Sequence, residues 1–388
     1  MKITNMIPKE LAYRIYNNEL AIIMDIQKNR VVLLQNRALE LWQDILENGK
    51  IDFGEDEEKI VDEFKANGLI VSDSELPLRS DLSNSIQEVD ISIVNYWAFK
   101  NRIPLSGHFE LTSQCNLRCT HCYTLFRKKD TLNTQQIFHI IDEMHKAGTL
   151  GLVLTGGEIF ARKDIVEILR YLYEKRFVLR LNTNGIFIDE KMVERIKEFT
   201  NIYRIHISLY SADAKIHDEI TNQKGSFEKT LNSIKLLKEA GFTLRINCSL
   251  MQANKNSYKQ IKTEIGDKLG VEVHYDPFIY PKDDGSVDNI FQTFDDKQVE
   301  EFDIFQQRNE DKEEKKPKLC KAGFSFFSIT EDGGLYPCLK MKRCYTNPLG
   351  DLTKTTFSDI WYKSDKIKMI RASLDNKLRD CSICDLKL

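Results

Sequence analysis

Strand-like and helix-like segments alternate from residue 105 to about residue 285, and this alternation restricts the fold more than any other feature. The strand-like segments are "HFELT", "GLVLT", "VLRLNT", "RIHISLY", "LRINCSL" and "VEVHYDPF". Two intervening segments, "TQQIFHIIDEMHKAG" and "GSFEKTLNSIKLLKEAG", have a helical apolar face and end at a glycine. Six βα units predict an α/β fold with a parallel sheet, a partial TIM-like (β/α)6 barrel. Functional groups are expected at the carboxyl ends of the strands.

Two further units flank the expected barrel. In residues 1–85, a hairpin signal in "LAIIMDI" and "RVVLLQ" precedes two helical segments, which suggests a winged helix-turn-helix domain. We expect a connector over 86–104, the barrel over 105–300, a charged linker over 301–317 and a small domain over 318–388. This last domain holds five of the nine cysteines, so we expect a metal to stabilise it.

Composition excludes several classes of protein. The net charge is −3, from 56 basic and 59 acidic residues, which argues against a broad nucleic-acid surface. No apolar run reaches the roughly 20 residues of a spanning helix, and the N-terminus has no secretion signal. We therefore expect a cytoplasmic protein without a membrane or nucleic-acid partner. The odd, clustered set of cysteines favours metal ligands over disulfides.

Three of the cysteines, Cys115, Cys119 and Cys122, lie in "CNLRCTHCY", directly after the first expected strand. Thiolates at this spacing can converge on one centre. A structural zinc site needs a fourth protein ligand, and His121 is the only nearby candidate. Three cysteines on a [4Fe–4S] cluster instead leave one iron open for chemistry.

The pattern C-x3-C-x2-C followed by an aromatic residue, here Tyr123, resembles the signature of the radical SAM enzymes. The resemblance covers residues 105–388. It implies a [4Fe–4S] cluster whose open iron binds the amino and carboxylate groups of S-adenosylmethionine (SAM). It also implies reductive cleavage of SAM to a 5′-deoxyadenosyl radical, with electrons from a donor such as flavodoxin or ferredoxin.

Further segments match the same family in order. The "TGGE" segment resembles the motif that binds the methionine amine of SAM, although a simple tight turn would also explain its glycines. The "NTNG" and "ISLYS" segments resemble the loop beside the cofactor and the strand whose hydroxyl binds the ribose. By this resemblance the cofactor-binding residues are Tyr123, Gly156, Gly157, Glu158, Asn184, Ser208 and Asn247.

One departure concerns the SAM carboxylate. Many relatives place an arginine in the stretch that matches "HDEITNQKGSF", and this chain offers only Lys224 there. His206 and His274 lie on expected strands, where a hydrogen-bonded lining role is more common than catalysis.

The C-terminal cysteines predict a second cluster. "TEDGGLYPC" contains a tight hairpin signal that can bring two cysteines together, and the last two cysteines are one helical turn apart. The spacing resembles the twitch domain, a shortened relative of the SPASM domain. This resemblance implies one auxiliary [4Fe–4S] cluster, with a zinc ribbon as the alternative. Its expected ligands are Cys320, Cys338, Cys381 and Cys384.

Cys248 and Cys344 remain unassigned. Each is either an ordinary free cysteine or a donor of a hydrogen atom to a substrate radical, as radical peptide epimerases require.

The N-terminal unit resembles the recognition element of peptide-modifying enzymes, which binds a leader peptide as an added strand. A DNA-binding winged helix is disfavoured because "IDFGEDEEKIVDEF" is acidic. We therefore expect a radical SAM maturase of a ribosomally made precursor peptide, which forms a thioether or carbon–carbon crosslink or inverts an α-carbon. One alternative is a twitch-type enzyme acting on a small molecule or a protein side chain, as sulfatase maturases do. The other is a non-enzymatic metal-binding regulator.

Overall fold

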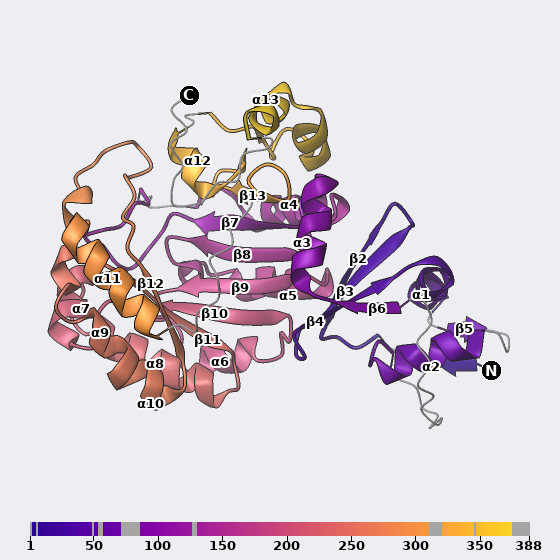
Figure 1. Ribbon diagram of the computed structural model, residues 1–388, viewed down its shortest axis with the longest axis horizontal. Helices are drawn as coiled ribbons and strands as arrows, with labels where there is room; N and C mark the ends of the chain where they lie inside the picture. The colour runs from indigo at the N-terminus through magenta and orange to yellow at the C-terminus, as the bar shows by residue number, and fades with distance from the viewer. Residues whose placement is uncertain are drawn as a thin grey trace.

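The computed structural model describes residues 2–4, 7–48, 50–52, 57–70, 86–125, 130–309, 320–344 and 347–374. Its largest element is a sheet with the strand order β12-β11-β10-β9-β8-β7-β13-β14-β15 (Figure 1). The first six of these strands are parallel and appear in the order that the sequence predicts. They are β7 (Ser106–Thr112), β8 (Gly151–Gly156), β9 (Val178–Thr183), β10 (Ile202–Ser208), β11 (Leu244–Ser249) and β12 (Glu272–Asp276).

Helices cover one face of this sheet and complete the expected partial barrel. A π-helical turn, Ile261–Gly266, joins two of the shorter helices. The charged segment near residue 300 forms the last helix of the barrel, which overlaps the linker expected over 301–317, and its Phe302 is buried. The helices are α4 (Thr134–Lys146), α5 (Ile165–Glu174), α6 (Glu190–Ile196), α7 (Ala214–Thr221), α8 (Ser226–Glu239), α9 (Tyr258–Gln260), α10 (Asp267–Leu269) and α11 (Asp296–Asn309).

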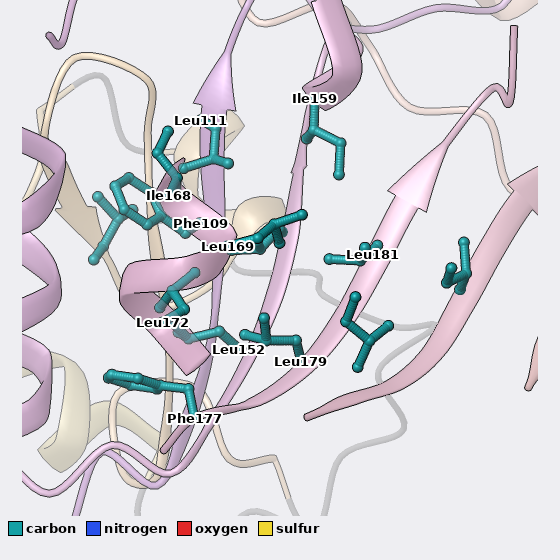
Figure 2. Packing of buried hydrophobic residues seen from close by; sticks show 14 of the residues in the cluster. Phe109, Leu111, Leu152, Ile159, Ile168, Leu169, Leu172, Phe177, Leu179 and Leu181 are labelled. Atoms are coloured by element: carbon teal, nitrogen blue, oxygen red, sulfur yellow. The ribbon is translucent and has the colours of Figure 1, made fainter. Parts of the chain in front are cut away.

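The two faces of the barrel strands differ in polarity because side chains alternate along a strand. Apolar side chains such as Phe109, Leu152 and Leu181 face the helices and are fully buried there (Figure 2). Burial of each such side chain contributes roughly 1.5–3 kcal/mol. The concave face carries the polar partners of the alternation, such as Thr155 and Asn182, and therefore supplies the chemistry.

The C-terminal unit continues the barrel's sheet. Strand β13 (Phe326–Ile329) pairs in parallel with β7, and β14 (Gly334–Tyr336) and β15 (Gly350–Asp351) extend the sheet in antiparallel fashion. A Cβ at Gly107 would lie 2.5 Å from the Phe327 ring, so glycine is needed for this close approach. Above β7 lie α12 (Leu339–Cys344), a π-helical turn (Asp359–Lys363) and α13 (Asp365–Leu374) (Figure 1).

The N-terminal unit forms an antiparallel sheet with the order β2-β3-β4-β6. The expected hairpin is β3 with β4, and both expected helices are present, the second ending at Ala66 shortly before Gly68, which has φ +64°. Strand β2 was not expected, and the connector contains β6 and α3. The elements are β1 (Lys2–Thr4), β2 (Leu11–Tyr16), β3 (Leu20–Asp25), β4 (Arg30–Leu34), α1 (Asn36–Asn48), β5 (Lys50–Asp52), α2 (Glu58–Ala66), β6 (Ile86–Val89) and α3 (Ile91–Lys100). The winged helix-turn-helix assignment stays a prediction.

The N-terminal sheet docks at the amino ends of the barrel strands (Figure 1). Arg14 Nε donates to the Thr149 carbonyl at 2.8 Å, and the Tyr16 hydroxyl donates to the Gly148 carbonyl at 2.8 Å. Arg176 Nη1 donates to the Pro8 carbonyl at 2.6 Å. These bonds place the N-terminal unit at the opposite end of the barrel from the first cysteine cluster. Within the described ranges, no helix is long and apolar enough to cross a bilayer.

Candidate active site

The three N-terminal cysteines border a cavity of about 480 Å³ at the carboxyl ends of the barrel strands. The structure thus brings together segments that are far apart in the sequence. Of the expected cofactor residues, six line this cavity: Tyr123, Gly156, Gly157, Asn184, Ser208 and Asn247. Glu158 is not among the described residues that line it.

The glycines of "TGGE" hold the cysteine loop against β8. The backbone N–H of Gly157 donates to the Thr112 carbonyl at 2.7 Å, and that of Glu158 donates to the Gln114 carbonyl at 2.8 Å. A Cβ at Gly156 would lie 2.1 Å from the Thr112 oxygen, and one at Gly157 would lie 2.2 Å from the Gln114 oxygen. Gly156 also has φ +130°, a conformation that favours glycine. Both glycines are therefore required by the contact itself.

The Glu158 side chain does not face the cavity, although its motif resembles one that binds the methionine amine of SAM. It is fully buried, and its carboxylate accepts hydrogen bonds from Phe160 N at 2.9 Å, Thr183 Oγ1 at 2.8 Å and Asn184 N at 2.7 Å. Burial raises the pKa of this carboxyl group, although the hydrogen bonds oppose that shift. The carboxylate thus fixes the loop after β9, and the part of the motif that faces the cavity is Thr155, Gly156 and Gly157.

Asn184 connects the loop after β9 to the cysteine loop. Its Nδ2 donates to Asn116 Oδ1 at 2.9 Å and lies 3.8 Å from Cys115 Sγ. Its backbone carbonyl accepts from Thr230 Oγ1 at 2.8 Å. The Cys115 sulfur also lies 3.4 Å from the backbone N–H of Leu117, a donor suited to a thiolate.

Two residues that the sequence analysis missed support the cysteine loop. The buried Tyr210 hydrogen-bonds through its hydroxyl with the Cys119 thiol, and its ring packs edge-on against His121 at 4.7 Å. Asn289 is buried, and its Nδ2 donates to the carbonyls of His121 at 3.1 Å and Tyr280 at 2.8 Å. Tyr210 lies two residues beyond Ser208 and was detectable from "ISLYS", whereas no local signal marks Asn289.

The electrostatics of the loop fit a metal site. Burial raises the pKa of the Cys115 thiol to about 11, and it also raises the pKa of the Cys119 and Cys122 thiols. Buried thiolates are therefore unfavourable at neutral pH unless a cation stabilises them. Three such thiols beside one cavity have the donor chemistry that an iron–sulfur cluster requires.

Two other expected residues differ from the polar lining residues of the cavity. Lys224 is exposed and is not among the described residues that line the cavity. Cys248 is among the residues that line the cavity, but it is only 1% exposed and belongs to the apolar core, where its neighbour across the strand pair is Tyr275, which packs on Tyr258. This environment is that of an ordinary buried cysteine, and the hydrogen-donor role stays a prediction.

The C-terminal site is described in part. The hairpin turn at Gly333, with φ +90°, forms as expected between β13 and β14. Cys320 and Cys338 flank this hairpin in sequence, and both are half-buried. Cys344 ends α12, while Cys381 and Cys384 lie outside the described residues.

A buried ion cluster connects this unit to the barrel. Lys342 Nζ lies 2.9 Å from Glu110 Oε2 and 2.9 Å from Asp283 Oδ2, and 4.0 Å from Glu331 Oε2. Glu110 comes from β7 and Lys342 from α12. Burial raises the pKa of Glu110 to about 7, against the effect of the Lys342 ammonium.

Comparisons with known proteins agree with this site. The sequence model of the Radical SAM superfamily matches residues 109–255, and that of the SPASM iron–sulfur cluster-binding domain matches residues 320–385. The chain is 28% identical to the AdoMet-dependent heme synthase of Methanosarcina barkeri, over 72% of this chain and 88% of that protein. It is 28% identical to the subtilosin biosynthesis protein AlbA of Bacillus subtilis, over 67% of this chain and 60% of AlbA.

Among solved structures, SuiB of Streptococcus suis bound to its precursor peptide SuiA superimposes with a TM-score of 0.62 at 17% identity. The superposition covers 95% of this chain and 90% of SuiB. The chain thus carries a radical SAM domain over residues 109–255 and a SPASM domain over residues 320–385. The first domain implies SAM and a [4Fe–4S] cluster, and the second implies auxiliary iron–sulfur clusters.

Proposed function

We propose that the protein is a radical SAM maturase that removes a hydrogen atom from a ribosomally made precursor peptide. The observation that carries the proposal is the cavity that joins Cys115, Cys119 and Cys122 to the "TGGE" turn, Ser208 and Asn247. Peptide chemistry is supported by two of the similar proteins, because AlbA acts in bacteriocin biosynthesis and SuiB was solved with a precursor peptide. The product is expected to be a thioether, a carbon–carbon crosslink or an inverted α-carbon.

The residues of this chain would hold and shield the reactants. The three thiolates would hold the [4Fe–4S] cluster, which supplies the electron that cleaves the sulfonium of SAM. The backbone of the "TGGE" turn would orient the amine of SAM, and Ser208 and Asn247 would bind its ribose. Tyr210 and His121 close the inner side of the cysteine loop and exclude water from it. Electrons would come from a flavodoxin or ferredoxin.

The chemistry is tested with anaerobically reconstituted protein, SAM and dithionite. We expect 5′-deoxyadenosine to form, and its formation to fall to background in Cys119→Ala. A reconstituted protein that binds iron and sulfide but forms no 5′-deoxyadenosine would contradict the proposal. Co-expression with a short open reading frame next to the coding sequence, followed by mass spectrometry, would identify the modification.

The N-terminal sheet is the proposed leader-binding element. Strand β2 is docked on the barrel through Arg14 and Tyr16, whereas β6 ends the sheet on the other side in the described part of the chain. An extended leader can add to β6 as a further strand. A photo-crosslinking residue in place of the exposed Glu88 on β6 should capture the precursor peptide. The same residue in place of the exposed Glu239 on α8 is the control and should not.

A second candidate function is a radical reaction on a small molecule. It is favoured by the similarity to a heme synthase. The chain is 28% identical to that protein, and the match covers 88% of the heme synthase. The crosslinking experiment separates the candidates. Turnover of a small molecule without capture of any peptide from Glu88 would support this second function.

A further inference from the structure

The concave face of the barrel contains positive charge to which the proposed function assigns no ligand. Three arginines project from it or its margin, Arg180 on β9, Arg204 on β10 and Arg245 on β11. Glu272 pairs with Arg204 at 2.8 Å and acts on Arg245 at longer range, and the carboxylate of Asp276 also lines the cavity. Arg180 and Arg245 both line the cavity below the cysteine loop.

The position of these two arginines is set by strand register. Arg180 precedes Asn182 by two residues, and Arg245 precedes Asn247 by two residues, so both lie on the same face as the cavity's polar wall. Two residues along a strand correspond to roughly 6.6 Å. The Cα atoms of the two arginines thus belong to a layer below the residues that would hold SAM, and Arg245 Nε donates upward to Asn247 Oδ1 at 3.1 Å.

The neighbours of the two arginines indicate a positive electrostatic potential. His206 lies on the same face and is 8% exposed. Burial and the nearby Arg245 and Arg180 lower its pKa to about 3. Burial and Arg180 likewise lower the pKa of His108 to about 4. Both histidines are thus neutral, because a further cation is unfavourable in this layer.

Buried polar atoms in the same layer lack hydrogen-bond partners. They are His108 Nδ1 and Asn182 Oδ1. Buried polar atoms in proteins are normally satisfied, so a group of them beside a cavity indicates a bound ligand or ordered water. Arg180 also lines a second cavity, of about 570 Å³, between the barrel and the N-terminal sheet, so this layer is accessible from two sides.

We propose that Arg180 and Arg245 bind a carboxylate group inside the barrel, in the layer below the SAM site. A guanidinium group matches the planar geometry of a carboxylate and can donate two parallel hydrogen bonds to it. The inference rests on the proposed function, because the carboxylate belongs either to an acidic side chain of the substrate or to SAM itself. The second source is relevant because the family's arginine is missing and Lys224 does not reach the cavity.

Binding to the reconstituted holoenzyme tests the proposal without turnover. The cofactor arm compares the Kd of SAM with that of decarboxylated SAM. The substrate arm, at saturating SAM, compares acetyl-Gly-Glu-Gly-amide with acetyl-Gly-Gln-Gly-amide. We expect Arg180→Gln and Arg245→Gln each to reduce the preference for the carboxylate ligand at least ~10-fold in one of the two arms. The arm that responds shows whether the bound carboxylate belongs to SAM or to the substrate.

Arg204→Gln is the matched control, because it removes a guanidinium group of the same sheet that already has a carboxylate partner. It should retain both preferences. Arg180→Lys and Arg245→Lys keep the charge and lose the planar fork, so intermediate losses are expected if the wild-type contact is bidentate. Iron content and circular dichroism confirm that each variant is folded.

Unchanged preferences in both arms would overturn the proposal, as would an equal loss in Arg204→Gln. Failure of the proposed function would look different. If the protein forms no 5′-deoxyadenosine but still prefers the carboxylate ligands through Arg180 and Arg245, the carboxylate site is supported and the proposed maturase function is wrong.

Discussion

The two candidate cluster sites are assembled by the chain in different ways. The first takes its three thiols from residues 115–122, a single loop held by β8, Asn184, Tyr210 and Asn289. The second takes Cys320 and Cys338 from the two sides of a hairpin, and its other expected ligands follow more than one further helix. We expect the metal of the first site to contribute chemistry only, because the barrel already holds its loop. We expect the metal of the second site to contribute folding stability as well, because its ligands are dispersed over a small unit.

The largest effect should come from Cys119→Ala. Loss of a thiolate ligand should lower 5′-deoxyadenosine formation by at least ~1000-fold, about 4 kcal/mol in the barrier. The melting temperature should change little, because the loop's backbone contacts remain. Activity assays and calorimetry on the same preparation check this. A large loss of stability would show that the first site, too, is needed for folding.

Cys338→Ala should have the opposite balance. We expect a loss of at least ~2 kcal/mol of unfolding free energy, together with lower iron content, because the auxiliary metal contributes to folding of the C-terminal unit. Limited proteolysis should then cleave preferentially within residues 320–374. The exposed Met369 supplies the control Met369→Ala, which should leave both readouts unchanged. Equal protease resistance of the two variants would contradict the comparison.

Glu158→Gln tests whether the first site depends on its supporting loop. The substitution replaces an acceptor of three hydrogen bonds by an amide whose NH2 group faces a donor. We expect a loss of about 2 kcal/mol in stability and a 10- to 100-fold loss of activity. Glu167→Gln, on the exposed face of α5, is the control. A variant with wild-type stability would exclude the positioning role.

Glu110→Gln probes the contact between the two regions through pH. The pKa of Glu110 is raised to about 7 in the folded protein, so the folded state binds more protons than the unfolded state above about pH 4.5. Stability from this group is present at low pH and is lost as pH rises towards 7. As pH rises towards 7, the unfolding free energy of the variant should fall by roughly 1–2 kcal/mol less than that of the wild type, as measured by thermal unfolding. Parallel curves for both proteins would refute the assignment.

Cys248→Ala should have the smallest effect. The side chain is buried in the helix-facing core, so we expect about 1 kcal/mol of destabilisation and turnover within twofold of wild type. Product analysis by mass spectrometry checks the hydrogen-donor hypothesis directly. An accumulated or altered product in this variant would establish that role.

Local signals made much of the molecule predictable. The six barrel strands follow from their apolar alternation, and the "TGGE" turn follows from glycines that a neighbouring backbone requires. The pairing of β13 with β7 was not predictable, because no local pattern records which distant strand completes a sheet edge. The orientation of Glu158 and the role of Asn289 likewise depend on tertiary contacts.

The pairing of β13 with β7 has a mechanical consequence. Strand β7 runs directly into the Cys115 loop, and Cys320 shortly precedes β13, so one hydrogen-bonded ladder joins the backbones on which Cys115 and Cys320 lie. The backbone distance between the two sites is therefore set by the hydrogen-bonded sheet and does not depend on a hinge.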